Sequence, residues 1–310
     1  PPAATSLSSR PFRHCALHAP RDRNMKSRLL VLYVTSVALA LFYAASPTTA
    51  ADFTAGIGRS FASFAELRSA RPTATGELVY LTSYLPNLNK GGGQFRGTLS
   101  SGTDDGGMVA SNGSNFRWDR IMNDFEQLNV LHFGATHDGI VDDHDAVVRM
   151  FNYVSVSTIT GVARNGIRFV AGKIKISPVD FTNPAIVEFA LFGPTSPSPT
   201  GTYTTILSDG SNLPVFNVSA RRTTIRGIAW DGQVTATVDP TTYVATGLSN
   251  VQPFFQNIET AGEFINVAQF YATRTGGDIF NLLDTLDTKF ENILTNNTYS
   301  NFWNILWSND

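Results

Sequence analysis

The chain has 310 residues, with 23 Lys or Arg and 25 Asp or Glu, and a formal net charge of −2. Residues 1–50 carry six of the basic residues and one of the acids, so the net charge of the remainder is −7. We expect no nucleic-acid partner, because phosphate contacts need clustered Lys and Arg. The only cysteine, Cys15, also lies in residues 1–50. The remainder therefore cannot form a disulfide, a thiol nucleophile or a cysteine-ligated zinc site.

Residues 25–50 have the pattern of a secretory signal peptide. Lys26 and Arg28 form a basic start, residues 29–45 are almost entirely apolar, and residues 48–50 are small, as a signal peptidase requires. An uncleaved N-terminal anchor is the alternative, although a spanning helix needs roughly 20 apolar residues. We expect cleavage, and therefore a secreted, periplasmic or cell-surface protein with no stable membrane insertion.

Residues 1–24 precede this signal and are rich in Pro, Arg and Ser without any periodicity. A signal peptide stands at the N-terminus of a protein. We therefore interpret residues 1–24 as a non-native upstream extension, with a disordered tail as the alternative.

Residues 51–130 have the features of a small separate module. Ser63 and Glu66 have capping-box spacing and predict a short helix that ends before Pro72. Glycine-rich turns then separate short strands. The expected strands are Leu78–Leu81, Gln94–Leu99, Met108–Ala110 and Asn115–Ile121. This order of elements resembles the neck segment that precedes the β-helix in phage tailspikes.

Residues 131–151 are the most informative stretch of the sequence. An apolar run ends in Phe133-Gly134-Ala135, a turn follows at Asp138-Gly139, and Asp142 or Asp143 caps a helix over residues 142–154. This order resembles the first segment of the pectate-lyase-like family, whose domains are right-handed parallel β-helices that act mostly on polysaccharides. The resemblance implies that the helix covers the open end of the β-helix, which a stack of repeats requires.

From Gly166 onward, short β-branched and aromatic runs alternate with turn residues, which is typical of a sandwich, barrel or solenoid. Asn and Thr recur at the ends of these runs, and this favours the solenoid. The runs are Ile167–Val170, Ile174–Ile176, Ile186–Phe192, Thr204–Leu207, Val215–Val218, Thr223–Trp230, Phe264–Val267, Phe280–Leu283, Phe290–Leu294 and Phe302–Leu306. Residues 166–176 and 223–232 resemble turn segments of the same family.

We therefore predict an all-β protein, a right-handed parallel β-helix with an N-terminal capping helix, preceded by a small mixed α and β module. The predicted domains are the module at 51–130 and the β-helix at 131–310. No second cap is visible before Asp310, so we expect the β-helix to be truncated at its C-terminus.

Three histidines and four aspartates lie close together at the start of this region: His132, His137, His144, Asp138, Asp142, Asp143 and Asp145. A metal site is one interpretation. No two of these histidines stand four residues apart on a helix, and the family resemblance does not require them. We expect a turn and a helix start instead, and no metal site.

Two chemistries guide the choice of catalytic candidates. Glycoside hydrolysis needs two facing carboxyl groups, and β-elimination needs a base and a cation that stabilises the enolate. Seven acids of the strand-rich part are candidates: Asp231, Glu259, Glu263, Asp278, Asp284, Asp287 and Glu291. We select Asp231, Asp284 and Asp287 as catalytic candidates, with Trp230 and Glu291 as substrate-binding candidates. Asp284 and Asp287 are expected to flank a turn; for each acid, a solvated turn residue is the alternative.

The resemblance and the signal peptide together imply a secreted lyase or glycoside hydrolase that depolymerises an acidic or cell-surface polysaccharide. The alternative is a non-catalytic, tailspike-like carbohydrate- or receptor-binding protein. We expect no cofactor, apart from calcium if the protein is a lyase. The tailspike resemblance also implies a homotrimer.

Overall fold

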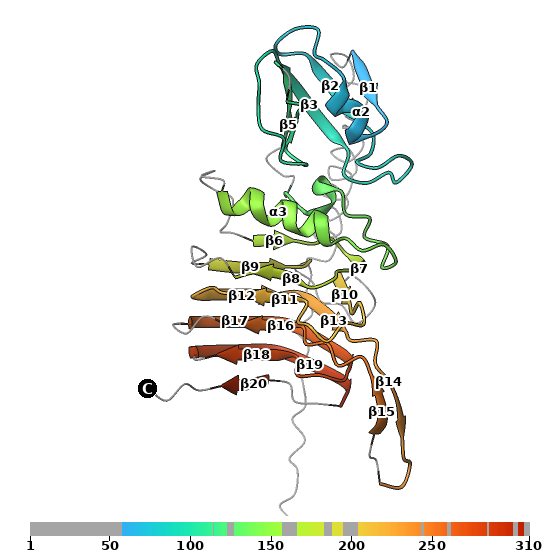
Figure 1. Cartoon of the computed structure of the whole chain (residues 1–310), viewed down its shortest axis with the longest axis vertical. Helices are drawn as coiled ribbons and strands as arrows, with labels where there is room; N and C mark the ends of the chain where they lie inside the picture. Colours follow the sequence, from blue (N-terminus) through green and yellow to red (C-terminus); the bar gives the residue numbers. More distant parts are fainter. Residues whose placement is uncertain are drawn as a thin grey trace, which may run out of the picture. The chain divides into compact units, whose positions relative to one another are not determined.

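The computed structural model describes residues 58–113, 115–122, 127–156, 166–182, 188–194, 204–242, 245–258, 262–283, 285–299 and 303–306. The signal peptide and upstream extension proposed from the sequence lie outside these residues. None of the described helices is long and apolar enough to span a bilayer. Figure 1 shows the order of the elements.

The first described region is a five-stranded sheet with one helix against it. The strand order is β1 (Arg59–Phe61), β2 (Leu78–Leu81), β3 (Gly93–Thr98), β5 (Arg117–Ile121), β4 (Val109–Ala110). The β1–β2 pair is parallel and the other pairs are antiparallel. Helix α2 (Phe64–Ser69) begins at the expected N-cap, Ser63, whose Oγ accepts a hydrogen bond from Glu66 N. Helix α2 and strands β2, β3, β4 and β5 agree with the helix and strands expected from the sequence, whereas β1 was not predicted.

This region has its own hydrophobic core, formed by α2 and the inner face of the sheet. Phe64, Leu67, Phe95 and Trp118 are all buried in it. A second core begins at Leu128 and continues through the rest of the described chain. The predicted domain boundaries themselves stay a prediction.

Helix α3 (His144–Val156) covers the first coil of the second core, as expected of a capping helix. It follows a short 3-10 helix, η1 (Val130–Phe133). The apolar face of α3 is buried, and the ring of Phe151 lies 3.8 Å from that of Phe181 and 6.0 Å from that of Phe189. The helix therefore closes the apolar end of the strand stack.

Successive strands after α3 lie above one another in coils, and three parallel ladders result. The first ladder contains β6 (Gly166–Arg168), β9 (Glu188–Phe192), β12 (Arg222–Arg226), β17 (Gly262–Thr275) and β19 (Thr285–Thr298). The second contains β7 (Gly172–Lys175), β10 (Thr204–Leu207), β13 (Ile228–Asp231) and the later halves of β17 and β19. The third contains β8 (Val179–Phe181), β11 (Phe216–Val218), β16 (Phe255–Asn257), β18 (Phe280–Leu283) and β20 (Trp303–Leu306).

The strand register places like residues in columns inside the coils. Ile167, Leu191, Ile225, Val267 and Phe290 follow one another in the first ladder. Aromatic rings fill the space between the ladders, for example Phe254 with Phe270 at 5.2 Å and Phe255 with Phe280 at 6.2 Å. Such ring pairs each contribute roughly 0.5–1.5 kcal/mol beyond their buried area. The expectation of an all-β parallel β-helix is confirmed.

The bends between the first and second ladders need a left-handed backbone. Gly227, Gln269 and Asn292 have φ values of 71°, 53° and 53°, and the register places them at equivalent points of three consecutive coils. A Cβ on Gly227 would lie 2.7 Å from the carbonyl oxygen of Pro194. The corner therefore admits Asn or Gln in some coils, whereas close approach of the neighbouring backbone requires glycine at position 227.

An antiparallel hairpin, which the sequence did not predict, interrupts the third coil. It consists of β14 (Thr235–Val238) and β15 (Ala245–Ser249) and lies between β13 and β16. Figure 1 shows it projecting from the stacked strands. Its residues are mostly exposed.

Candidate functional site

The histidine and aspartate cluster holds the turn before α3 in place. The carboxylate of Asp143 is buried and accepts hydrogen bonds from Thr136 N at 2.6 Å, Thr136 Oγ1 at 3.0 Å and His137 N at 2.9 Å. Burial raises the pKa of Asp143, while these bonds act in the opposite direction. Asp142 Oδ1 accepts from the amides of His144 and Ser177. Both carboxylates thus accept hydrogen bonds from backbone amides, which agrees with the expectation of a turn and a helix start.

The buried histidines of this cluster are held in their neutral form. Burial, and then the charge of Arg120, lower the pKa of His132 to about 3. Burial, and then the charge of Lys90, lower the pKa of His137 to about 4. Within the described ranges, no three His, Cys, Asp or Glu side chains are grouped so as to hold a metal ion.

Asp231, a catalytic candidate, ends β13 at the root of the hairpin. Its carboxylate forms a bidentate ion pair with Arg274, with Nε 2.8 Å from Oδ1 and Nη2 on Oδ2. Oδ1 also accepts from the amide of Gln233 at 3.0 Å. The residue is only 8% exposed. The carboxylate therefore fixes the corner where the chain leaves the second ladder for the hairpin.

Further polar side chains surround this corner. Ser208 Oγ donates to Gln252 Oε1 at 2.6 Å and lies 2.9 Å from Asn250 Oδ1. Asn250 Nδ2 donates to the carbonyl of Gly232 at 2.8 Å. Gln233, Asn250 and Arg274 all have positive φ values, 54°, 69° and 48°. Non-glycine residues in this conformation cost free energy and are concentrated at turns and functional sites.

Trp230 does not have the position predicted for it. Its side chain is fully buried and lies 5.5 Å from the ring of Phe254 in the core. Side chains of consecutive strand residues point to opposite faces, so Trp230 points inward while Asp231 points to the corner. The prediction that Trp230 stacks on a sugar is therefore wrong.

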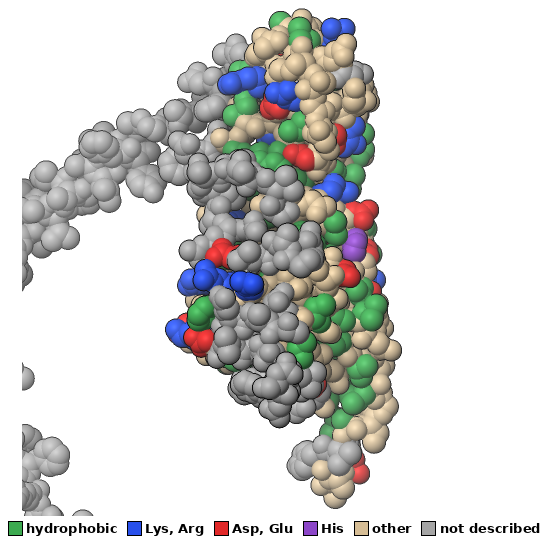
Figure 2. Space-filling model, turned by 60° about the vertical axis from the view of Figure 1, so that its left-hand side comes forward, with side chains coloured by type: hydrophobic (Ala, Val, Ile, Leu, Met, Phe, Trp, Pro, Cys, Tyr) green, Lys and Arg blue, Asp and Glu red, His purple; other side chains and the backbone are tan. Residues whose placement is uncertain are grey.

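The outer surface of the first ladder carries a different group of residues, which we call the arginine face. Its members occupy outward positions in two columns of the register. One column contains Glu188, Arg222, Phe264 and Asp287; the other contains Arg168, Phe192, Arg226, Ala268 and Glu291. On the left of the view in Figure 2, at mid-height, basic and acidic side chains lie beside one another. The surface of the coils on the right of the view is mainly uncharged.

Arginines and aromatic rings contact one another on this face. The guanidinium carbon of Arg168 lies 4.8 Å from the ring centre of Phe192, and that of Arg222 lies 5.7 Å from the ring centre of Phe264. Arg222 Nη1 is 3.5 Å from Glu188 Oε1, and Arg226 Nε donates to Gln269 Oε1 at 3.2 Å. Phe264 is 47% exposed, which is unusual for a phenylalanine.

Two of the candidates from the sequence lie on the arginine face. Asp287 and Glu291 are both exposed on β19, and Glu291 forms an ion pair with Lys289 at 2.7 Å. Asp287 is the third residue of β19, and the expectation that it and Asp284 flank a turn stays a prediction. Asp284 lies outside the described residues. Four residues of extended strand separate Asp287 from Glu291 by about 13 Å, which is wider than the pair that glycosidases use.

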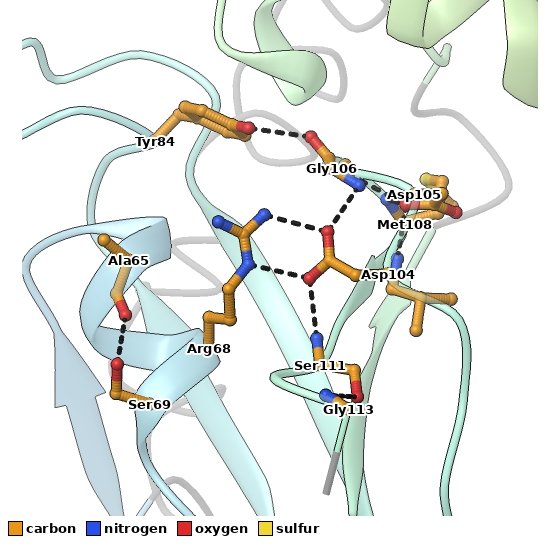
Figure 3. A network of polar contacts seen from close by, with 12 residues as sticks. Ala65, Arg68, Ser69, Tyr84, Asp104, Asp105, Gly106, Met108, Ser111 and Gly113 are labelled. Carbon is orange, nitrogen blue, oxygen red and sulfur yellow. Dashed lines mark hydrogen bonds and ion pairs between the residues drawn. The ribbon is translucent and has the colours of Figure 1, made fainter.

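A third polar network fixes a loop of the N-terminal sheet (Figure 3). Asp104 binds Arg68 through two hydrogen bonds, of 2.7 and 2.8 Å, and also accepts from the amides of Gly106 and Ser111. Asp105 Oδ1 accepts from three consecutive amides, at residues 107–109. Both acids of the sequence Asp104-Asp105-Gly106-Gly107 therefore shape this loop through hydrogen bonds to its backbone.

Comparison with known proteins identifies the fold. Residues 60–123 match the family described as the phage tail protein small four-stranded beta-sheet domain. The structure of Pantoea stewartii WceF, described as a glycan biofilm modifying enzyme with a bacteriophage tailspike-like parallel beta-helix fold, is 28% identical with a TM-score of 0.68. That match covers 81% of this chain and 34% of WceF. This chain has a tailspike-like parallel β-helix fold.

One further relative and one further solved structure are informative. The amylovoran biosynthesis protein AmsF of Erwinia amylovora is 33% identical over 231 residues, which are 74% of this chain and 29% of AmsF. The tailspike gp49 of Acinetobacter baumannii phage Fri1, a capsular polysaccharide depolymerase, is 14% identical with a TM-score of 0.51, over 76% of this chain and 46% of gp49. The chain spans less than half the length of each of these proteins. The finer resemblance to the pectate-lyase-like family stays a prediction.

Sequence reasoning missed both Arg274 and the arginine face. Arg274 is far from Asp231 in the sequence, and no local pattern links the two residues. Arg222, Phe264 and Asp287 become neighbours only through the strand register. A signal for the face did exist, because an arginine recurs at an outward position in β6 and β12.

Proposed function

We propose that this protein is exported and modifies an acidic or cell-surface polysaccharide, as a lyase or a glycoside hydrolase. The observation that carries the proposal is the similarity to WceF, a glycan-modifying enzyme, in both sequence and fold. The similarity to AmsF, a protein of amylovoran biosynthesis, supports the same class of substrate. Export rests on the predicted signal peptide.

The test is incubation of the full chain with a panel of bacterial acidic exopolysaccharides and capsular polysaccharides. We expect the viscosity of at least one polymer to fall and new reducing ends to appear. A rise in ultraviolet absorbance from unsaturated uronates would identify a lyase, and its absence during cleavage would identify a hydrolase. Parallel reactions with calcium and with a chelator test the expected calcium requirement of a lyase. No cleavage of any polymer contradicts the enzymatic proposal.

A binding protein without catalytic activity is the second candidate, and two observations favour it. Asp231 is buried in an ion pair with Arg274, and Asp287 and Glu291 are too far apart along β19 to act as a facing pair. If this candidate is right, the chain binds a polymer of the panel and leaves its length unchanged. The homotrimer and the absence of nucleic-acid binding also stay predictions, which analytical ultracentrifugation and a gel-shift assay test.

A further inference from the structure

In the first three coils the arginine face carries three arginines and one acid, although the net charge of the whole chain is negative. Arg168, Arg222 and Arg226 all occupy outward positions in the first three coils, where Glu188 is the acid that shares their columns. A guanidinium group presents a planar set of donors that matches a carboxylate. The part of the arginine face that the first three coils form is therefore complementary to an anionic ligand.

The same face offers an exposed aromatic ring beside an arginine. The ring of Phe264 is 47% exposed, and Arg222 lies 5.7 Å from its centre. Exposed aromatic rings pack against apolar surfaces of ligands, and stacking holds the guanidinium plane in one orientation. A sugar ring stacked on Phe264 would place a carboxylate on its edge within reach of Arg222.

The spacing of the arginines suits an extended ligand. Arg168 and Arg226 belong to the same column two coils apart, which is about 10 Å at the spacing of neighbouring strands. Arg222 and Arg226 are four residues apart on β12, or about 13 Å. A single monosaccharide cannot contact all three side chains, whereas a polymer with repeated anionic groups can.

We propose that the arginine face binds a carboxylate-bearing polysaccharide through Arg168, Arg222 and Arg226, with Phe264 as the platform for one sugar ring. This inference rests on the proposed function and specifies the class of substrate. Asp287 lies next to Phe264 in the same column and Glu291 lies two coils from Arg226. Their carboxylates accept hydrogen bonds from sugar hydroxyls and repel ligand carboxylates, which confines the anionic groups to the arginine end of the face.

The experiment is affinity gel electrophoresis of the full chain in gels that contain polygalacturonate, alginate, hyaluronate or xanthan. Methyl-esterified polygalacturonate and dextran serve as uncharged polymers. We expect retardation by at least one carboxylated polymer and none by the uncharged ones, with a loss of affinity in high salt. Equal retardation by the methyl ester, or no retardation by any of the four acidic polymers, contradicts the proposal.

Variants locate the binding surface. Each of Arg222→Ala, Arg226→Ala and Phe264→Ala is expected to weaken binding about tenfold, the loss of one charge-assisted hydrogen bond or one buried ring contact. Arg222→Lys keeps the charge and loses the planar fork, so we expect it to restore binding only in part. The control is Arg96→Ala, which removes an exposed arginine from β3 in the N-terminal sheet. Unchanged binding in all three alanine variants contradicts the proposal.

The cleavage assay separates this inference from the proposed function. If Arg222→Ala cleaves a polymer with an unchanged KM, the proposed enzymatic activity stands and the proposed binding role of the arginine face is rejected. Binding that depends on Arg222 and Phe264, without cleavage by the parent chain, would support the face and reject the enzyme.

Discussion

His137 is a buried histidine in an unusual backbone conformation. Its φ is 51°, its Nε2 has no hydrogen-bond partner among the described residues, and the side chain of Lys90 donates to its carbonyl oxygen at 3.3 Å. A Cβ on Gly172 would lie 2.9 Å from its Nδ1, so the ring covers the start of β7. The protonated form would be charged in a site that already holds the charge of Lys90.

The pKa of His137, lowered to about 4, predicts acid sensitivity. In the unfolded chain the pKa of this histidine is about 6.5, so below that pH the unfolded chain binds a proton that the folded chain does not. Stability from this residue is therefore present above about pH 6.5 and is lost as the pH falls toward 4. His137→Asn removes the titration and suits a positive φ. Between pH 7 and pH 4.5 in urea unfolding, we expect the parent to lose roughly 2 kcal/mol more than the variant; an equal loss contradicts the argument.

Residue type alone did not reveal which side chains of the candidate site point outward. The sequence identified Trp230 and Asp231 as neighbours but could not show that the tryptophan belongs to the core. In β13 both faces are buried, because Ile228 and Trp230 belong to the core and Ala229 on the opposite face is also buried. The alternation of apolar and polar residues that normally shows the buried face is therefore weak in β13, whose four residues are all buried.

Helix α3 is an element whose position and role were correctly predicted. Its acids and apolar spacing mark the start and the buried face locally, within one stretch of sequence. The long strands β17 and β19 were predicted only as short runs, because their bends at Gln269 and Asn292 interrupt the apolar pattern. The hairpin β14–β15 was missed, since its Thr-rich strands are exposed on both faces.

The packing of α3 predicts a large cost for removing its main ring. Phe151→Ala takes a nearly buried side chain from between Phe181 and Phe189 and is expected to lower the unfolding free energy by about 3–5 kcal/mol. Phe264→Ala is the matched control, because the same atoms leave a half-exposed position on β17, and we expect a change of about 1 kcal/mol. Urea unfolding followed by circular dichroism measures both. Similar losses in the two variants would show that α3 does not seal the core.

The corner at Gly227 predicts a difference between two glycines with similar backbone angles. Gly227 has a φ of 71° and faces the carbonyl of Pro194, whereas Gly247 in the hairpin has a φ of 66° and nothing within 4 Å of a Cβ. Both alanine variants bear the strain of a positive φ, about 1 kcal/mol. We expect Gly227→Ala to cost at least about 1 kcal/mol more, because backbone must move. Equal melting temperatures would contradict this explanation of the corner.

At the scale of the whole molecule, contacts of residues 90 and 91 link the N-terminal sheet to the segment before α3. Lys90 Nζ donates to the carbonyl oxygens of Thr136 at 2.7 Å and His137 at 3.3 Å. Arg120 supports the same loop from within the N-terminal sheet, because it is buried, donates to the carbonyls of residues 91, 92 and 107, and lies 4.5 Å from the ring of Phe95. Gly91 approaches the backbone of Leu131 so closely that a Cβ would clash with it.

Loss of the Lys90 contact is expected to affect the N-terminal sheet selectively. In native-state hydrogen exchange, Lys90→Ala should lower the opening free energy of residues 78–98 by about 1.5–3 kcal/mol, the value of one hydrogen bond from a charged donor. Residues 216–231 should keep the protection of the parent. Lys173→Ala, an exposed lysine on β7, is the control. A uniform change across both segments would mean that the two cores open as one unit.

The third coil accommodates the hairpin without any break in the ladders around it, since β13 and β16 keep their parallel partners on the neighbouring coils. The number of residues between β13 and β16 can therefore change without a change in the packing of the core. The root at residues 232 and 250 is therefore a natural graft point, where a shorter turn or a different hairpin can be inserted while the stacked strands on both sides keep their register.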